Sequence, residues 1–153
     1  MRTIPLLFLL TAHCSLLTAC SVTPLTNKIA VGEEAFVVAV GEGPDGMTDL
    51  FAAPAHGGAF VRLSFNRMVE STPRLSADGR RVVFLRRAEA PGSPSEIVEM
   101  SLVTGGERRV TLPGEVGAPT GVAWLAGEDA VWVRAPSGLY RIAGAPAGPA
   151  LPC

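Results

Sequence analysis

The chain has 153 residues, with 13 Lys and Arg against 14 Asp and Glu, so its formal net charge is −1. A balanced charge excludes the basic footprint of a nucleic-acid-binding protein and gives no reason to expect an acidic lipid surface as a partner. Once residues 1–19 are taken as a leader and Cys20 as its processing site, only His56 and Cys153 remain, so sites built of histidine and thiolate are excluded by count. The length suffices for one domain with a sizeable core.

The first residues have the layout of a leader for export. Arg2 is followed by an apolar run from Ile4 to Leu17 and then by small or polar residues. Such a run is too short to be a convincing membrane-spanning helix, and its flanks are typical of a cleaved signal peptide. We therefore expect residues 1–19 to be a signal peptide.

The end of that leader narrows the expectation further. Leu17-Thr18-Ala19-Cys20 resembles the lipobox of bacterial lipoproteins. The resemblance implies that Cys20 carries acyl chains such as palmitate, becomes the first residue of the mature protein, and moors residues 20–28 as a tether to a membrane of the cell envelope. Two or more acyl chains hold a protein durably on a bilayer. Ser21 favours the outer membrane over the inner one, and an ordinary signal peptide with an unmodified Cys20 is the alternative.

A nine-residue pattern recurs three times downstream of the tether. The copies lie at offsets of 47 and 48 residues, and each has a glycine, two charged residues and an apolar run. Glycine supplies the left-handed position of a tight turn, and the β-rich run is typical of a buried strand. The three glycines are Gly32, Gly79 and Gly127.

The middle copy is the clearest one. It predicts short antiparallel strands near 71–75, 81–86, 96–101 and 107–112, with the pair Gly105-Gly106 between the last two as a hairpin signal. Four strands in about 45 residues are typical of one propeller blade. The sequence therefore predicts an all-β fold of three propeller-type blades within residues 29–145, with a C-terminal tail at 146–153. The expected blades are 29–64, 70–112 and 116–145.

The same copy is similar to a known family. Pro73-Arg74-Leu75-Ser76-Ala77-Asp78-Gly79, followed by basic and then apolar residues, resembles the TolB-like, or WD-like, β-propeller repeat. Leu75 stands where that repeat has tryptophan, and Ala77 where it has a second proline. The third copy keeps a tryptophan, Trp124, but lacks the Asp-Gly turn. The resemblance implies a propeller whose surface binds other proteins of the cell envelope.

Three blades raise a question of closure. Known propellers typically have about four to eight blades, so three do not close a ring. An open array exposes an apolar face at each end, and such a face invites association. Four arrangements remain open: an arc capped by its tails, a chain docked on other blades, a relic of limited stability, and a homodimer in which two chains form a six-bladed ring.

Residues with the chemistry of a reaction centre are scarce. His56 is the only histidine after the leader, and no nucleophile motif accompanies it. We therefore expect no catalytic residue, no cofactor and no metal. Asp45 and Asp49 are candidate ligands for a hard cation such as calcium, although Pro44-Asp45-Gly46 already favours a turn.

Two further features concern binding. Trp124 is a candidate for stacking on a ligand, with packing between sheets as the alternative. Glu33-Glu34 and Glu128-Asp129 occupy the turn position at which the middle copy has Arg80-Arg81. A basic middle copy beside acidic neighbours would help blades or subunits to align, although exposed ion pairs contribute little each.

Cys153 is available for an intermolecular disulfide or forms an inert end.

These observations predict a lipid-anchored envelope protein that presents a non-catalytic surface to a protein partner. One alternative is a small-ligand or glycan-binding lipoprotein, with its site near the Asp45 loop and Trp124. The other is an accessory domain of a hydrolase. The leader, the repeats and the lack of a nucleophile–base pair favour the first.

Overall fold

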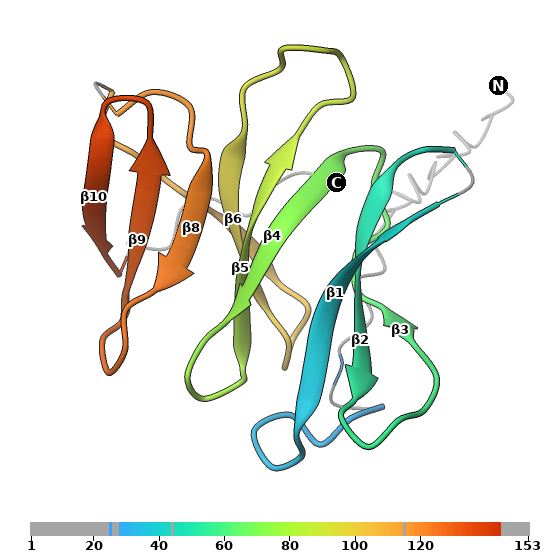
Figure 1. Ribbon diagram of the computed structural model, residues 1–153. Coiled ribbons are helices and arrows are strands. Elements are labelled where there is room, and N and C mark those ends of the chain that lie inside the picture. Colours follow the sequence, from blue (N-terminus) through green and yellow to red (C-terminus); the bar gives the residue numbers. More distant parts are fainter. Residues whose placement is uncertain (1–24, 26–27, 44, 115, 145–153) are drawn as a thin grey trace, which may run out of the picture.

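The computed structural model describes Leu25 and residues 28–43, 45–114 and 116–144. The leader, Cys20 and Cys153 lie outside the described residues. Ten β-strands form in the described part of the chain, and they gather into three groups that stand side by side (Figure 1). The all-β expectation is confirmed, and neither of the two sheets closes on itself. No helix in the described part is long and apolar enough to cross a bilayer.

The first group contains β1 (Phe36–Glu42), β2 (Thr48–Pro54) and the short β3 (Val61–Arg62). The strands are antiparallel, and β2 pairs with both others. The turn between β1 and β2 closes where the Gly43 N–H donates to the Met47 carbonyl at 2.8 Å.

The middle group is a four-stranded antiparallel meander. It consists of β4 (Val69–Leu75), β5 (Arg81–Arg87), β6 (Glu96–Ser101) and β7 (Glu107–Val110), paired in chain order. These bounds confirm the four strands expected in this region. A single parallel pair, Thr48 with Val69, joins β2 to β4, so the first seven strands form one sheet.

The third group is a separate sheet of three antiparallel strands in the order β10-β9-β8. β8 spans Gly121–Trp124, β9 spans Ala130–Ala135 and β10 spans Gly138–Ala143. The middle group's last strand, β7, has no counterpart here among the described residues.

The three aligned glycines occupy turns. Gly32, Gly79 and Gly127 have φ of +87°, +67° and +76°, and each stands a few residues before a strand, β1, β5 and β9 respectively. A side chain is disfavoured in this left-handed region, so glycine is the residue that these turns require.

The turn before β9 lies one residue farther along the chain from the turn before β5 than the sequence alignment indicates. The Ser76 N–H donates to the Arg81 carbonyl in the turn before β5, and the Leu125 N–H donates to the Ala130 carbonyl in the turn before β9. The structural offset is therefore 49, whereas the aligned glycines lie 48 apart. One residue matters because a slip of one moves every side chain of a strand to the opposite face. Val131 and Val133 thus correspond to Val82 and Phe84.

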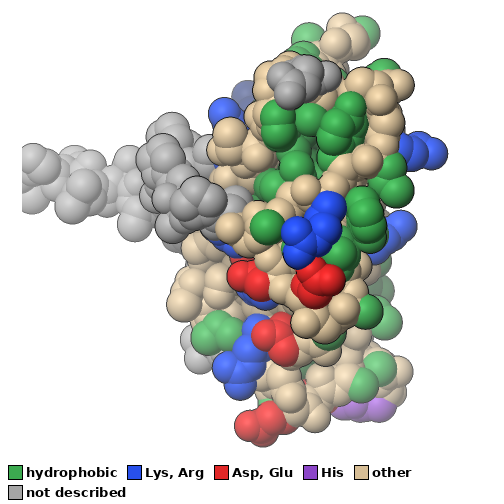
Figure 2. All heavy atoms as spheres, turned by 90° about the vertical axis from the view of Figure 1, so that its left-hand side faces the viewer, with side chains coloured by type: hydrophobic (Ala, Val, Ile, Leu, Met, Phe, Trp, Pro, Cys, Tyr) green, Lys and Arg blue, Asp and Glu red, His purple; other side chains and the backbone are tan. Residues whose placement is uncertain are grey.

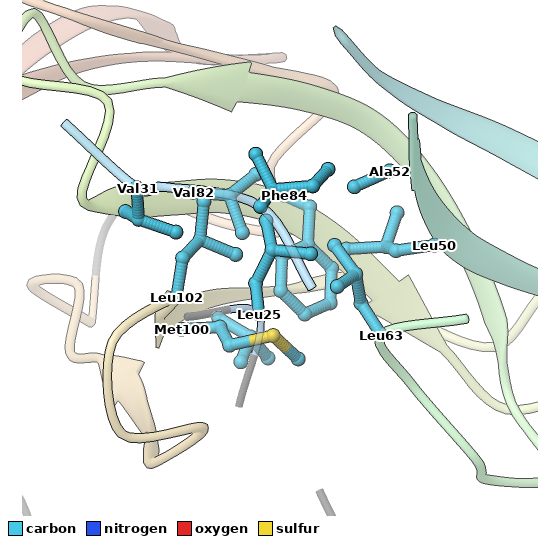
Figure 3. Close-up of a cluster of buried hydrophobic side chains, with 11 residues drawn as sticks. Leu25, Val31, Leu50, Ala52, Leu63, Val82, Phe84, Met100 and Leu102 are labelled. Atoms are coloured by element: carbon cyan, nitrogen blue, oxygen red, sulfur yellow. The ribbon is translucent and has the colours of Figure 1, made fainter. Parts of the chain in front are cut away.

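Alternate residues of the middle group are buried on opposite faces. One face packs against the first group in the first core, around Phe84, which is fully buried. Figure 3 shows Leu25, Leu50 and Leu63 gathered near its ring. The members of the first core are Leu25, Ile29, Val31, Leu50, Ala52, Leu63, Val82, Phe84, Val98, Met100 and Leu102.

The opposite face of the middle group packs against the third group in the second core. Its members are Val83, Leu85, Ile97, Val110, Val122, Val131 and Val133. β5 and β6 are thus covered on both faces, which explains why residues 82–86 form an uninterrupted buried run and do not alternate. The three groups form a stack with one group inside and two outside.

Candidate functional site

The outer face of the third group carries exposed apolar side chains. Val131 and Val133 point into the second core, so Trp132 and its neighbours point away from the stack. Trp132 is 39% exposed and Leu139 is 63% exposed. Arg134 pairs in register with Leu139, and Arg141 with Trp132. We call these four residues the β9–β10 face. Figure 2, viewed from the side of β8–β10, shows hydrophobic side chains interrupted by charged ones.

The first group has a corresponding outer face. Phe36 and Val38 pack against the first core, so Val37 and Ala39 point the other way, and Val37 is 51% exposed. Phe51 pairs with Ala39, and its ring lies over Gly41, where a Cβ atom would come within 2.6 Å of it. We call Val37, Ala39, Gly41, Phe51 and their neighbours Arg62 and Phe65 the β1–β2 face. The Arg62 guanidinium lies 4.8 Å from the centre of the Phe65 ring.

A buried polar cluster joins the first group to the middle group. The Glu70 carboxylate, with its side chain fully buried, accepts hydrogen bonds from Arg86 at 2.7 Å and from the Asn66 amide at 2.8 Å. The Ser64 hydroxyl donates to the same carboxylate and accepts from the Leu50 N–H at 2.9 Å. We call these side chains the Glu70 cluster. Ser64 is fully engaged there and has no histidine beside it, which is the arrangement of a structural hydroxyl.

Arg86 is held as a cation within this cluster. Its guanidinium also contacts Glu107 at 2.6 Å. Burial alone would lower the pKa of Arg86, but the hydrogen bonds and charges of Glu107 and Glu70 outweigh it and raise the pKa. A buried charge needs such partners, since it is costly to desolvate alone.

A second polar cluster joins the middle group to the third. Arg81 contacts Asp129 at 2.6 Å, and its guanidinium lies 4.6 Å from the centre of the Trp124 ring. The Trp124 indole N–H donates to the Arg74 carbonyl at 2.9 Å. Burial would lower the pKa of Arg81, yet Asp129 and Glu99 together raise it. We call Arg81, Glu99, Trp124 and Asp129 the Arg81 cluster. Arg81, Trp124 and Asp129 line a cleft of about 190 Å³ between the turn before β5 and the turn before β9.

The sequence-based candidates fall in separate places. Trp124 belongs to the Arg81 cluster, where Arg81 lies over its ring and its N–H is bonded. Asp45 is exposed, and its carboxylate accepts from the Met47 N–H at 3.2 Å. Asp49 is buried and pairs with Arg62. The two carboxylates thus have different partners, and the described residues contain no group of three or more His, Cys, Asp or Glu arranged to hold a metal.

His56 lies in the exposed turn after β2. Its Nδ1 is 3.4 Å from the Glu34 carboxylate, and its side chain is 72% exposed. A contact between side chains this exposed contributes little to stability.

A shallow groove of about 480 Å³ runs beside the edge strand β7. Its lining is mainly apolar, with Ile97 and Val110 among the buried side chains that reach it, and the Arg109–Glu96 ion pair at 2.6 Å near it. The groove has the chemistry to hold an apolar group.

Sequence reasoning missed the Glu70 cluster, because its members come from positions with no shared pattern. The Arg81 cluster could have been predicted from the sequence. The turn residues are basic in the middle copy (Arg80-Arg81) and acidic in the third (Glu128-Asp129), and Arg81 and Asp129 occupy the same position of the sequence alignment. Neither a protein-family model nor a curated protein sequence matches the chain.

Proposed function

We propose that this chain is a non-catalytic, protein-binding lipoprotein of the bacterial cell envelope. Its three strand groups act as the blades of an open propeller, and the outer faces of the first and last groups are the binding surfaces. The observation that carries the proposal is the exposure of large apolar side chains on both of these faces.

The propeller interpretation draws support from the packing. Each group presents one face to the group before it or after it, and the middle group buries both faces in this way. Stacked antiparallel sheets of this kind are the building pattern of propellers. The resemblance of residues 73–84 to a TolB-like repeat points in the same direction.

The binding interpretation draws support from what the exposed side chains are. Scattered surface leucines are ordinary, but tryptophan, leucine and arginine together on one sheet face are the composition of protein interfaces. Trp132, Leu139, Arg134 and Arg141 form such a set. The engaged state of Ser64 and the exposed position of His56 beside Glu34 offer no nucleophile–base pair, which favours a binding role over a hydrolytic one.

Membrane attachment rests on the lipobox resemblance at Leu17-Thr18-Ala19-Cys20. Replacing Cys20 by serine should move the protein from the membrane fraction to the soluble fraction. The matched control is Cys153→Ser, which should stay with the membrane. Equal partition of both variants would contradict the anchor.

A small-ligand role is the second candidate, and the apolar groove beside β7 favours it more than Trp124 does. Isothermal titration of the purified chain with glycans, fatty acids and calcium is the test. Saturable binding that Leu112→Arg abolishes, while Leu139→Arg does not, would favour this candidate over protein binding.

The protein-binding proposal is tested by photocrosslinking in cells. A photoreactive amino acid placed at Leu139 of the full chain should give discrete protein adducts, and the same residue placed at Val37 should do so too. The control position is Glu89, an exposed residue in the loop after β5. Adducts no more abundant at Leu139 and Val37 than at Glu89 would contradict the proposal.

A further inference from the structure

We propose that the partner of each outer face is the opposite outer face of a second copy of this chain, so that two chains stack head to tail. This inference rests on the proposed function, because it names the occupant of the same two surfaces. The β9–β10 face of one chain would cover the β1–β2 face of the other.

The first step is the correspondence between the middle and third groups. With the structural offset of 49, Trp132 lies where the middle group has Val83, and Arg134 where it has Leu85. Leu139 pairs with Arg134 as Ile97 pairs with Leu85, so Leu139 corresponds to Ile97. Val83 and Ile97 are buried against the third group. The third group thus presents large apolar side chains where the middle group is covered by the next sheet.

The second step is the same comparison at the other end. At the offset of 47, Val37 corresponds to Phe84, which is fully buried against the first group. Phe51 pairs with Ala39 and lies on the same face of the sheet as Val37. The β1–β2 face therefore carries apolar side chains where the middle group is covered by the preceding sheet. Within this molecule, the face that one group turns toward the next packs on the face that the next group turns back toward it. One face of each kind, the β9–β10 face and the β1–β2 face, is exposed at an end of the stack.

One basic side chain of the β9–β10 face has no acidic partner among the described residues. Residues 116–144 contain Arg134 and Arg141 against Glu128 and Asp129, and Arg141 is paired with Glu128. The described residues of the first group contain five acids against three bases, and Glu33, Glu42 and Asp45 are exposed. Arg134 is hydrogen-bonded to the neutral hydroxyl of Thr120, so its charge is available to an acidic surface. An acidic side chain of a second chain could therefore pair with Arg134.

Symmetry then limits the assembly. A contact between two different faces is heterologous, and it ends either in a closed ring or in a filament. Two chains of three groups bring six groups together, within the range in which propellers close. We therefore infer a closed dimer with two identical interfaces.

The experiment measures the mass of the purified full chain in solution. Cys20→Ser removes the lipid and Cys153→Ser removes disulfide-linked dimers, and both changes leave every described residue in place. Light scattering coupled to gel filtration should report a dimer at micromolar concentration. Leu139→Glu and Val37→Lys, introduced one at a time, should each give a monomer, with the dissociation constant raised by more than about tenfold. The matched control, Val103→Glu in the turn after β6, should remain a dimer.

Mixing the two variants is the decisive step. Leu139→Glu keeps an intact β1–β2 face, and Val37→Lys keeps an intact β9–β10 face, so an equimolar mixture should form a heterodimer with one interface. A circular dichroism spectrum like the parent's verifies that each variant is folded, and Leu139→Ser and Val37→Ser replace a variant that is not. A mixture that stays monomeric would overturn the head-to-tail contact, as would a parent that is monomeric at every concentration.

The other occupants of these faces give different results. If the chain's own residues 145–153 cover the β9–β10 face, the parent is monomeric and their deletion exposes Trp132, which overturns the inference. If photocrosslinking at Leu139 in cells yields a different protein while the purified chain stays monomeric, the inference fails and the protein-binding proposal stands. If neither crosslinks nor dimers are found, both fail.

Discussion

Arginines at the two boundaries of the middle group hold charge at places that are otherwise apolar. Arg86 lies between Glu70 and Glu107, and Arg81 lies between Glu99 and Asp129. A buried ion pair adds little net stability compared with an apolar pair, but removing one partner leaves a charge uncompensated. The pairs of Arg86 hold strands of the middle group together, Arg81–Asp129 joins that group to the third, and all are sensitive to substitution.

Glu70→Gln is expected to destabilise the chain by about 3 kcal/mol, because Arg86 and Ser64 lose their charged partner in a buried site. The matched control is Glu128→Gln. Glu128 pairs with Arg141 at the surface, where both side chains are about half exposed, so the cost should stay below about 1 kcal/mol. Urea unfolding measures both values. Equal losses of unfolding free energy would mean that the Glu70 cluster contributes no more to stability than an exposed ion pair.

Asp78 should make stability depend on acid pH. Its carboxylate accepts from the Ser76 hydroxyl at 2.5 Å and from the Arg80 N–H at 3.0 Å, and these bonds lower the pKa of Asp78 below its ordinary value. Because the folded pKa is the lower one, the stabilisation is full above the ordinary value and is lost as pH falls through the folded pKa.

Asp78→Asn should therefore destabilise the chain at about pH 7, and the difference from the parent should shrink at about pH 3. Unfolding in urea at the two pH values measures this, with Glu89→Gln as the surface control. A difference that stays constant or grows toward acid pH would rule out the assigned role of the Asp78 carboxylate.

At the scale of single elements, Gly127 in the turn before β9 and Gly114 in the loop after β7 differ in one respect that can be measured. Gly127 has φ of +76° and no atom within 4 Å of an added Cβ, so a side chain there meets only conformational strain. Gly127→Ala should cost about 1 kcal/mol. Gly114 has equally open surroundings without a left-handed φ, so Gly114→Ala should be neutral or slightly stabilising. Thermal unfolding of the two variants decides, and equal midpoints would contradict the turn geometry.

Packing between groups predicts a second contrast, between two phenylalanines. Phe84 is fully buried in the first core, and Phe60 is 68% exposed in the loop after β2. Phe84→Ala should cost about 3–5 kcal/mol through lost burial and the cavity left behind. Phe60→Ala should change stability by less than about 0.5 kcal/mol. Chemical denaturation measures both, and a small loss at Phe84 would mean that the first and middle groups do not pack as described.

The strands of the middle group could be predicted from sequence because their apolar runs are bounded by glycine and proline turns. The face that each strand of the third group buries could not, because the aligned glycines stand at different places in their turns. Gly79 is the third of the four residues between Ser76 and Arg81, and Gly127 is the second of those between Leu125 and Ala130. Only the hydrogen bonds of the turn reveal the added residue.

An irregular pairing of β4 with β5 made another part of the fold unpredictable from the sequence. The pairing of β4 with β5 shifts between Ser71 and Arg74, and Thr72 has φ of +51°, which is unusual for a residue other than glycine. Pro73 lacks the N–H that a regular ladder would use at this place. The Glu70 cluster just before this bulge combines nearby residues of the loop before β4 with partners 14 to 16 residues away, for which a single sequence gives no sign.

At the scale of the whole molecule, the described chain is a stack whose inner group is covered on both faces and whose outer groups are covered on one. This unequal covering carries the proposed function, because it leaves an apolar face at each end. It also predicts unequal stability along the chain, since the elements with the most buried contacts open least often.

Hydrogen–deuterium exchange tests this central claim most directly, by comparing β5 with β9 in the Leu139→Glu variant. Both strands have hydrogen-bonded neighbours on either side, so the main difference between them is whether one face or two are covered. The amides of β5 should exchange more than about tenfold more slowly than those of β9. Exchange from β9 as slow as from β5, or rapid exchange from β5, would contradict the stack.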